Sequence, residues 1–450
     1  MSFPLARTAT LAIACAIALA PTPSYALFGS GNSGIEEEAA KFAESKPEKL
    51  RPFYRQLYRD GEWGAVLNFQ QLGLAAMEAG DTDVARRSFD EAIARIELIY
   101  AGDENARRAL SLFSEEKVKD FKGEPYERAM AYYYRGVLYL RDGDYQNARA
   151  AFLAADLQDT MAEQETFAGD FGIMKYLAGW ASVCAGDAER GRVLIEEAKR
   201  ADSSIASLPD KPGKMVVLVD SGLPPLKQST GKHKEVLTFA RGEGPDGAVV
   251  VKAGATPGIT QFETGADLYF QASTRGGRQV DGVLGGKAQF KDNANTAGKI
   301  ATDVGMVAMM QGLSSDRSNL AGAGALIGLA GLLAKGVAAA TTPAADTRSW
   351  QSLPASLLLH TADGAMPANL TLASASGRGD AMLPIQATQG GCSIAWGRTR
   401  SALAASDGGT VRFADDKAQE RGREKKNELF RGMLKAEFAA VGLAKAGGAQ

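Results

Sequence analysis

The sequence predicts an α+β protein in which a helical repeat domain precedes a β-rich domain. Composition changes sharply near Leu208: Ala, Glu, Arg and aromatic residues at helical spacing dominate before it, whereas Gly, Thr and Val increase after it. A repeated pattern of small and aromatic residues lies in the first half, and short alternating runs lie in the second. These observations place helices and strands in separate parts of the chain.

The first 26 residues have the features of a secretory signal peptide. Arg7 precedes an apolar run from Ala9 to Ala20, and Ser24-Tyr25-Ala26 fits the small-x-small cleavage pattern. The apolar run is shorter than the roughly 20 residues that span a bilayer. We therefore expect cleavage near Ala26 and a periplasmic protein. An outer-membrane-associated lipoprotein is the alternative, since Cys15 lies in the apolar run.

The charge and the cysteine content of the remaining chain restrict its function. Removal of Arg7 reduces the 51 Lys and Arg residues to 50, against 53 Asp and Glu residues. A nearly neutral chain gives no basis for a nucleic-acid partner. Of three cysteines, Cys184 and Cys392 remain. They can pair in an oxidising compartment, but the sequence does not determine whether they do.

Three stretches within residues 35–207 share one pattern of small and aromatic positions. The central copy has Gly136, Tyr139, Gly143, Ala148, Phe152 and Ala155; the upstream copy has Gly73, Ala76, Gly80, Ala85, Phe89 and Ala92; the downstream copy has Gly179, Ser182, Gly186, Gly191, Ile195 and Ala198. The second glycine of each copy is expected to end a first helix in the left-handed conformation. This pattern is typical of the tetratricopeptide repeat, or TPR, whose helix pairs stack into a surface that binds other chains.

The first helices of the three units are predicted to line a concave, partner-binding groove. Alignment on the glycines places nine residues there: Gln70, Leu74, Met77, Tyr133, Val137, Leu140, Tyr176, Trp180 and Val183. Such an apolar surface should not stay open to water, so either this chain or a protein partner is expected to cover it. The alternative is an alignment shifted by one turn, in which case these residues belong to the core.

A Gly/Ala-rich helical hairpin, residues 296–340, is predicted to interrupt the β-rich half. Residues 320–334, LAGAGALIGLAGLLA, carry no charge. Three interpretations stay open for 320–340: a buried helix packed on the repeats or the β region, a segment in peripheral contact with a membrane or marginally spanning it, and a loosely ordered or self-associating segment.

Short strand-like runs lie on both sides of this insertion. They cover 215–220, 236–241, 248–252, 267–272 and 278–284 before it, and 356–361, 368–373, 383–387, 393–396 and 410–413 after it. They predict a sandwich-like sheet. The resulting organisation is a signal peptide (1–26), a TPR-like helical domain (35–207), a β-rich domain (213–413) with the insertion, and a charged helical tail (414–450).

Several longer motifs resemble a known group of proteins. They are Glu124-Pro125-Tyr126-Glu127-Arg128, then Tyr132-Tyr133-Tyr134-Arg135-Gly136, Gly143-Asp144-Tyr145, Val216 to Gly222, and Ala345-Asp346-Thr347-Arg348-Ser349-Trp350 through Leu353-Pro354. With these motifs the chain resembles uncharacterised bacterial envelope proteins that join tetratricopeptide repeats to a C-terminal β-rich region. The resemblance implies export and an envelope role, and it implies no reaction.

The sequence offers little for catalysis. Of two histidines, His233 lies in a charged Lys-His-Lys run and His360 ends an apolar strand; neither has metal-ligand spacing. We therefore predict no catalytic, cofactor-binding or metal-binding residues and no cofactor. Asp346, Arg348 and Trp350 form a candidate contact segment, because Arg and Trp are common at binding hot spots. A structural role is the alternative, with Asp346 and Arg348 fixing a turn and Trp350 packed against the sheet.

These observations predict an exported, non-catalytic scaffold or adaptor that binds protein partners in the bacterial cell envelope. One alternative is a membrane-associated or self-assembling envelope protein that uses segment 320–340. The other is a glycan-processing enzyme with a pair of carboxylates, which no motif selects. The sequence leaves the oligomeric state open.

Overall fold

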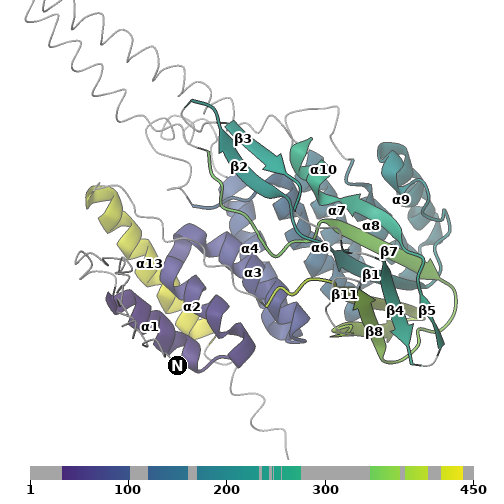
Figure 1. Cartoon of the computed structure of the whole chain (residues 1–450), viewed down its shortest axis with the longest axis horizontal. Coiled ribbons are helices and arrows are strands. Elements are labelled where there is room, and N and C mark those ends of the chain that lie inside the picture. The colour runs from purple at the N-terminus through teal and green to yellow at the C-terminus, as the bar shows by residue number, and fades with distance from the viewer. Residues whose placement is uncertain are drawn as a thin grey trace, which may run out of the picture.

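The computed structural model describes residues 33–101, 120–160, 170–232, 236–242, 246, 248–254, 256–274, 345–374, 381–403 and 417–438. It has an α+β fold, which confirms the predicted class: helical repeats form the N-terminal half and sheets follow (Figure 1). The predicted runs 278–284 and 410–413 and the insertion 296–340 lie outside the described residues.

The helical half consists of antiparallel helix pairs that stack in chain order. It contains α1 (Ser33–Glu44), α2 (Arg51–Asp60), α3 (Ala65–Glu78), α4 (Thr82–Ala101), α6 (Pro125–Arg141), α7 (Tyr145–Thr160), α8 (Gly172–Cys184) and α9 (Ala188–Ala201). The pairs α3–α4, α6–α7 and α8–α9 are the three predicted repeat units, and α7 also packs against α8. Helices α1 and α2 precede the first unit in the chain.

The repeated glycines are required by close packing and by the turns. A Cβ added at Gly136 would lie 2.7 Å from the Phe152 ring, and one added at Gly73 would lie 3.0 Å from the Phe89 ring. The first helix of each unit therefore approaches the second at a position where no side chain fits. Gly143 has φ +73°, a left-handed conformation that glycine adopts without strain.

Three sheets follow the repeats. Their strands are β1 (Met215–Ser221), β2 (Leu226–Thr230), β3 (Val236–Ala240), β4 (Val249–Ala253), β5 (Thr256–Ile259), β6 (Glu263–Asp267), β7 (Ser356–Ala362), β8 (Leu370–Ser374), β9 (Ala381–Met382), β10 (Ile385–Gln389) and β11 (Cys392–Arg398). The main sheet has the order β10-β11-β1-β7-β6; a second has the order β5-β4-β8-β9; β2 and β3 form a hairpin. Only β1 and β11 pair in parallel among these described strands.

Strand β1 lies in the middle layer of the molecule, and its alternation shows how the layers pack. All seven of its residues are buried. Val216 and Leu218 belong to the apolar core shared with the helices, whereas Val217 and Val219 belong to a second core with β4 and β8. Because successive side chains of a strand point to opposite faces, the main sheet has the repeats on one face and the four-stranded sheet on the other.

One predicted strand, 267–272, is wrong: this segment forms the short helix α10 (Leu268–Ser273), directly after β6. The Asp267 carboxylate accepts hydrogen bonds from the backbone amides of Tyr269 and Phe270, which satisfies the free donors at the helix start. The buried residues are Leu268, Gln271 and Ala272. Their spacing fits one face of a helix and not the period of a strand.

The charged tail forms α13 (Lys417–Glu437), which returns to the N-terminal helices and lies beside α1 and α2 (Figure 1). Phe430 contacts Phe69 with ring centroids 6.0 Å apart, and Phe438 contacts Tyr54 at 5.6 Å. Phe430, Leu434 and Phe438 are buried at a spacing of four residues. An apolar stripe thus fixes the tail despite its many charges. Among the described residues, no helix combines the length and the apolarity needed to cross a bilayer.

Candidate functional site

The predicted groove residues lie in the core of the fold. All are buried except Val183, which is partly exposed: Gln70, Leu74, Met77, Tyr133, Val137, Leu140, Tyr176 and Trp180. For units two and three the reason is the main sheet: α6 contacts β10 and β11, and α8 contacts β6. In unit one, α3 instead contacts α13 through Phe69 and Phe430, and its Glu78 accepts hydrogen bonds from the Ser401 hydroxyl and the Ala402 amide. Within the described part of the chain, the protein's own C-terminal half therefore contacts all three first helices, by way of the sheet for α6 and α8. The filler proposed from sequence, 320–340, lies outside the described residues.

Polar atoms of these side chains bond to the chain that follows the repeats. The Trp180 indole Nε1 donates to the carbonyl oxygen of Gly213 at 2.8 Å, and the Tyr176 hydroxyl donates to that of Pro209 at 2.9 Å. Both acceptors lie in the segment that connects the last repeat with β1. The aromatic residues of unit three thus bond to the segment that leads into the sheet.

A buried carboxylate, Asp220, lies at the carboxyl end of β1, where the sheet meets α6. The Tyr134 hydroxyl donates to Oδ2 at 2.7 Å, and the Trp396 indole Nε1 donates to Oδ1 at 3.3 Å. Burial raises the pKa of Asp220 to about 6, while Arg398 and the two hydrogen bonds act in the opposite direction. The carboxylate is therefore held by uncharged donors at the junction of both halves.

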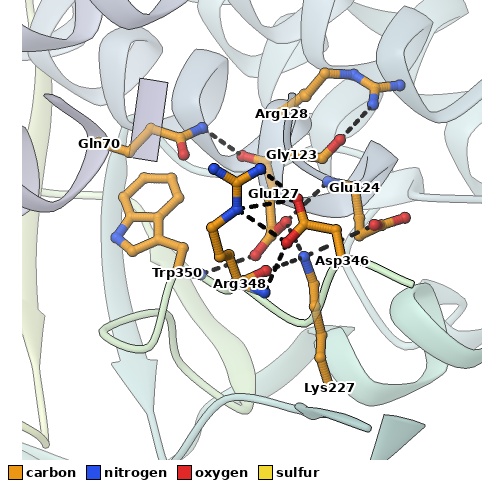
Figure 2. Close-up of polar contacts among 9 residues, drawn as sticks. All are labelled: Gln70, Gly123, Glu124, Glu127, Arg128, Lys227, Asp346, Arg348 and Trp350. Carbon is orange, nitrogen blue, oxygen red and sulfur yellow. Dashed lines mark hydrogen bonds and ion pairs between the residues drawn. The ribbon is translucent and has the colours of Figure 1, made fainter. Parts of the chain in front are cut away.

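A second buried carboxylate, Glu127, joins three segments that are far apart in the sequence (Figure 2). At the start of α6 it forms a reciprocal capping box with Glu124, whose backbone amide donates to Glu127 Oε2 at 2.8 Å. The same oxygen lies 2.6 Å from Nζ of Lys227 on β2. The other oxygen accepts from the backbone amide of Trp350 at 2.8 Å. One side chain thus links the repeats, the hairpin and the segment 345–354.

The candidate contact segment lies against this cluster. Arg348 forms a bidentate pair with Asp346, with nitrogen–oxygen distances of 2.9 Å and 2.7 Å, and its guanidinium lies 4.3 Å from the Trp63 ring centroid. Trp350 is buried and lies near the Tyr134 ring, at 5.6 Å between centroids. Figure 2 shows Asp346 and Arg348 beside Glu127 and Lys227, with the backbone nitrogen of Trp350 bonded to Glu127. The geometry matches the structural alternative. Through Trp350, the segment that leads into β7 is bonded to Glu127 and packed against Tyr134 of α6.

The structure also brings predicted residues from the two candidate sets together. Gln70, from the groove set, donates through Nε2 to the backbone carbonyl of Glu127 at 3.3 Å. Trp350, from the contact segment, donates through its backbone amide to the carboxylate of the same residue. Lys227 also donates to the carbonyl oxygen of Arg348 at 2.8 Å. Gln70 and the contact segment therefore meet at one interior cluster around Glu127.

Cys184 and Cys392 form a disulfide, which the sequence left open. The bond connects the end of α8 with the first residue of β11, across 208 residues of sequence. It covalently fixes the last repeat unit to the main sheet.

Sequence reasoning missed Lys227 and Asp220 as junction residues. Lys227 follows Pro-Pro-Leu at the start of a strand that no alternating pattern marks, so nothing in the sequence indicates a buried lysine. Asp220 is a different case, since an acidic residue at the end of the apolar run MVVLVD is unusual for a buried strand and was a detectable signal.

The chemistry available at the junction is that of ion pairs and hydrogen bonds whose partners are all protein groups. His360 donates through Nδ1 to the Gln261 carbonyl oxygen at 2.9 Å, and His233 lies outside the described residues. In the described ranges, no group of three or more His, Cys, Asp or Glu side chains could hold a metal ion.

Comparison with known proteins supports the repeat part of the chain. A family model described as tetratricopeptide repeat matches residues 98–162, a range that includes α6 and α7. No curated protein and no solved structure matches the chain. The match spans less than half of the 450 residues. The evidence therefore identifies tetratricopeptide repeat sequence at the centre of the helical half, within a chain of α+β fold.

Proposed function

We propose that the protein is an exported, non-catalytic TPR scaffold or adaptor that mediates protein–protein interactions in the bacterial cell envelope. The observation that carries this proposal is the repeat array itself: helix pairs packed through the Gly–aromatic contacts, with a tetratricopeptide repeat match over residues 98–162. TPR arrays act by presenting a rigid surface to other chains.

The covalent link between the two halves supports export. Disulfides form and persist in oxidising compartments such as the bacterial periplasm and are rare in the cytosol. Cys184–Cys392 pairs the two cysteines that remain after the expected cleavage near Ala26. An envelope location and the signal peptide at 1–26 are therefore proposed together.

The buried junction determines which surfaces are left for a partner. The groove positions are buried apart from the partly exposed Val183, with the sheet against α6 and α8 and with α13 against α3, so a partner would bind outward-facing surfaces and not these nine positions. Glu127, Lys227 and Trp350 then belong to the framework that keeps the repeats and the sheets in one fixed arrangement.

The experiment is recovery of a C-terminally tagged full chain from the organism's envelope. We expect release by osmotic shock, loss of residues 1–26 by N-terminal sequencing, and a stable partner after chemical cross-linking. A variant lacking residues 2–26 is the control and should stay in the cytoplasm without that partner.

Three outcomes would contradict the proposal. Cytoplasmic recovery of the full chain would exclude export. Recovery only with detergent, or as large particles that contain this chain alone, would favour the membrane-associated or self-assembling alternative through 320–340. Turnover of a cell-wall or polysaccharide substrate by the purified chain would exclude a non-catalytic role and favour the glycan-processing alternative.

A further inference from the structure

A pocket of about 500 Å³ lies between the two larger sheets, with Ser221 at the end of β1 among its lining residues. It is bordered by the end of β1, the end of β3, the beginning of β4, the beginning of β7 and α10. Pockets that bind small molecules commonly have volumes of about 300–1,000 Å³. The size of this one is therefore sufficient for a small organic ligand.

The walls of the pocket are part apolar and part polar, and Ser221, Asp246, Thr260 and Ser356 contribute polar groups. Leu223, Pro225, Phe262 and Leu358 line it, together with the backbone of Gly222 and Gly242. The two glycines permit close approach: a Cβ at Gly242 would lie 2.6 Å from the carbonyl oxygen of Leu223. An apolar ligand body would be removed from water against these walls.

Arg241 places an oriented positive charge in this pocket. Its Nη1 lies 2.9 Å from Asp267 Oδ2, and its guanidinium lies 4.4 Å from the centroid of the Tyr269 ring. Asp267 and Tyr269 both belong to the start of α10, so the ion pair and the cation–π contact hold the guanidinium in one place. Its Nε and Nη2 have no partner among the described residues, which leaves donors for a ligand.

The carboxylates near the pocket are already occupied by protein donors. Asp246 accepts from the Gly222 amide at 2.7 Å and from Arg400 Nε at 2.8 Å, and it also bonds to the Thr399 hydroxyl. Asp267 accepts two amides of α10 in addition to Arg241. Among the described residues that line the pocket, Arg241 is therefore the charged side chain with donor atoms left for a ligand. These donors favour an anionic acceptor on the ligand.

From this combination we propose that the pocket is a binding site for a small amphiphilic anion, with its acidic group on Arg241 and its apolar body against Phe262, Leu358 and Leu223. This site is separate from the cluster around Glu127 and Lys227, and it does not depend on the proposed scaffold role. The acidic group is bound by charge-assisted hydrogen bonds, and the body is bound by burial of apolar surface.

The test uses two fluorescent probes that differ in charge. 1-Anilinonaphthalene-8-sulfonate carries a sulfonate, and N-phenyl-1-naphthylamine has the same aromatic body without it. We expect both to bind the folded full chain with one-to-one stoichiometry, displacing each other. Arg241→Gln should weaken sulfonate binding by about tenfold or more, the loss expected for a charge-assisted hydrogen bond, and leave the neutral probe within about twofold.

Three further variants keep the test interpretable. The Arg241 side chain is 65% exposed, so its replacement should not unfold the protein, and Arg241→Lys should restore part of the sulfonate affinity. Phe262→Ala should weaken both probes. Arg192→Gln, at an exposed arginine that is also ion-paired, is the matched control on α9 and should change neither.

The proposal fails if no saturable one-to-one site exists in the folded chain. It also fails if Arg241→Gln and Arg192→Gln give equal sulfonate affinities, or if Arg241→Gln weakens the neutral probe as much as the charged one. Circular dichroism and the thermal unfolding midpoint of each variant verify that the fold is unchanged.

Discussion

Lys227 and Glu127 form an ion pair in the interior of the protein, with Nζ 2.6 Å from Oε2 and side-chain exposures of 1% and 0%. Lys227 comes from the β2–β3 hairpin and Glu127 from the start of α6. A charge that is removed from water needs a partner. The folded protein places these two side chains together, and the loss of either one would leave the charge of the other buried and poorly compensated.

The first prediction concerns this pair. Glu127→Gln should lower the free energy of unfolding by up to about 3–5 kcal/mol, because it leaves the buried Lys227 ammonium with only the more distant Glu124 carboxylate, 3.8 Å away, as counter-charge. The double variant with Lys227→Met should lose less than the sum of both single variants, since it removes the unpaired charge as well. Denaturant unfolding at constant pH measures both.

A solvent-exposed pair provides the control. Arg190 lies 3.3 Å from Asp187, and the two side chains are 58% and 44% exposed. Arg190→Met should change stability by no more than about 1 kcal/mol. Equal losses for Glu127→Gln and Arg190→Met would show that the interior pair does not hold the junction.

The second prediction is a pH dependence from Asp220. Its pKa is raised from 3.8 to about 6 by burial, so the folded state binds the proton more tightly than the unfolded state. The stability contributed by this proton is fully present below pH 3.8 and is lost as pH rises through about 6. The size of the effect is about 3 kcal/mol, from about 1.4 kcal/mol for each pKa unit.

Asp220→Asn removes this ionisation and should flatten the stability profile between pH 4 and pH 7, measured by denaturant unfolding relative to the wild type. In the wild type, the hydrogen bond from Tyr134 lowers the pKa of Asp220. Tyr134→Phe keeps the carboxyl group but removes this donor, so the pKa of Asp220 should rise. This variant should therefore shift the transition to higher pH. An Asp220→Asn profile parallel to that of the wild type would contradict the prediction.

The third prediction concerns the disulfide. Reduction, or replacement of Cys184 and Cys392 by Ser, should lower stability by up to about 5 kcal/mol, because the bond closes a long loop in the unfolded chain. Thermal unfolding with and without reductant measures the change. The doubly substituted protein should be insensitive to reductant; if the reductant still lowers its midpoint, the loss has another origin.

The fourth prediction tests the docking of α13. Phe430→Ala and Leu434→Ala should each destabilise the protein by about 3–5 kcal/mol, because both side chains are buried against the N-terminal helices. Leu429→Ala is a control on the same helix, since Leu429 is 70% exposed. It should change stability by less than about 0.5 kcal/mol. Similar unfolding free energies for all three variants would show that α13 does not pack as described.

The repeat units could be predicted because their determinants are local. Gly143 ends α6 in a left-handed turn, and Gly136 opposes Phe152 within the same helix pair. The continuous apolar run MVVLVDS likewise indicates a strand that is buried on both faces, as β1 is. In these cases the interacting residues lie within one helix pair or one strand, so the sequence pattern carries the structure.

The candidate site was less predictable because its parts come from distant segments. The nine groove residues were selected by their position in the repeat, but their environment depends on segments that come much later in the chain, such as β10 and β11 for unit two and α13 for unit one. The segment 267–272 has a strand-like composition, and the capping hydrogen bonds of Asp267 favour a helix there.

The sequence by itself determined that helical repeats precede a β-rich half, because helix periodicity, strand alternation and glycine turns are set by neighbouring residues. Only the tertiary structure decided what covers the first helices, that Cys184 pairs with Cys392, and that Glu127 meets Lys227. The disulfide and the Glu127–Lys227 pair join residues separated by 100 or more positions. They arise from the burial of apolar surface between the two halves, which brings the polar partners together and removes them from water.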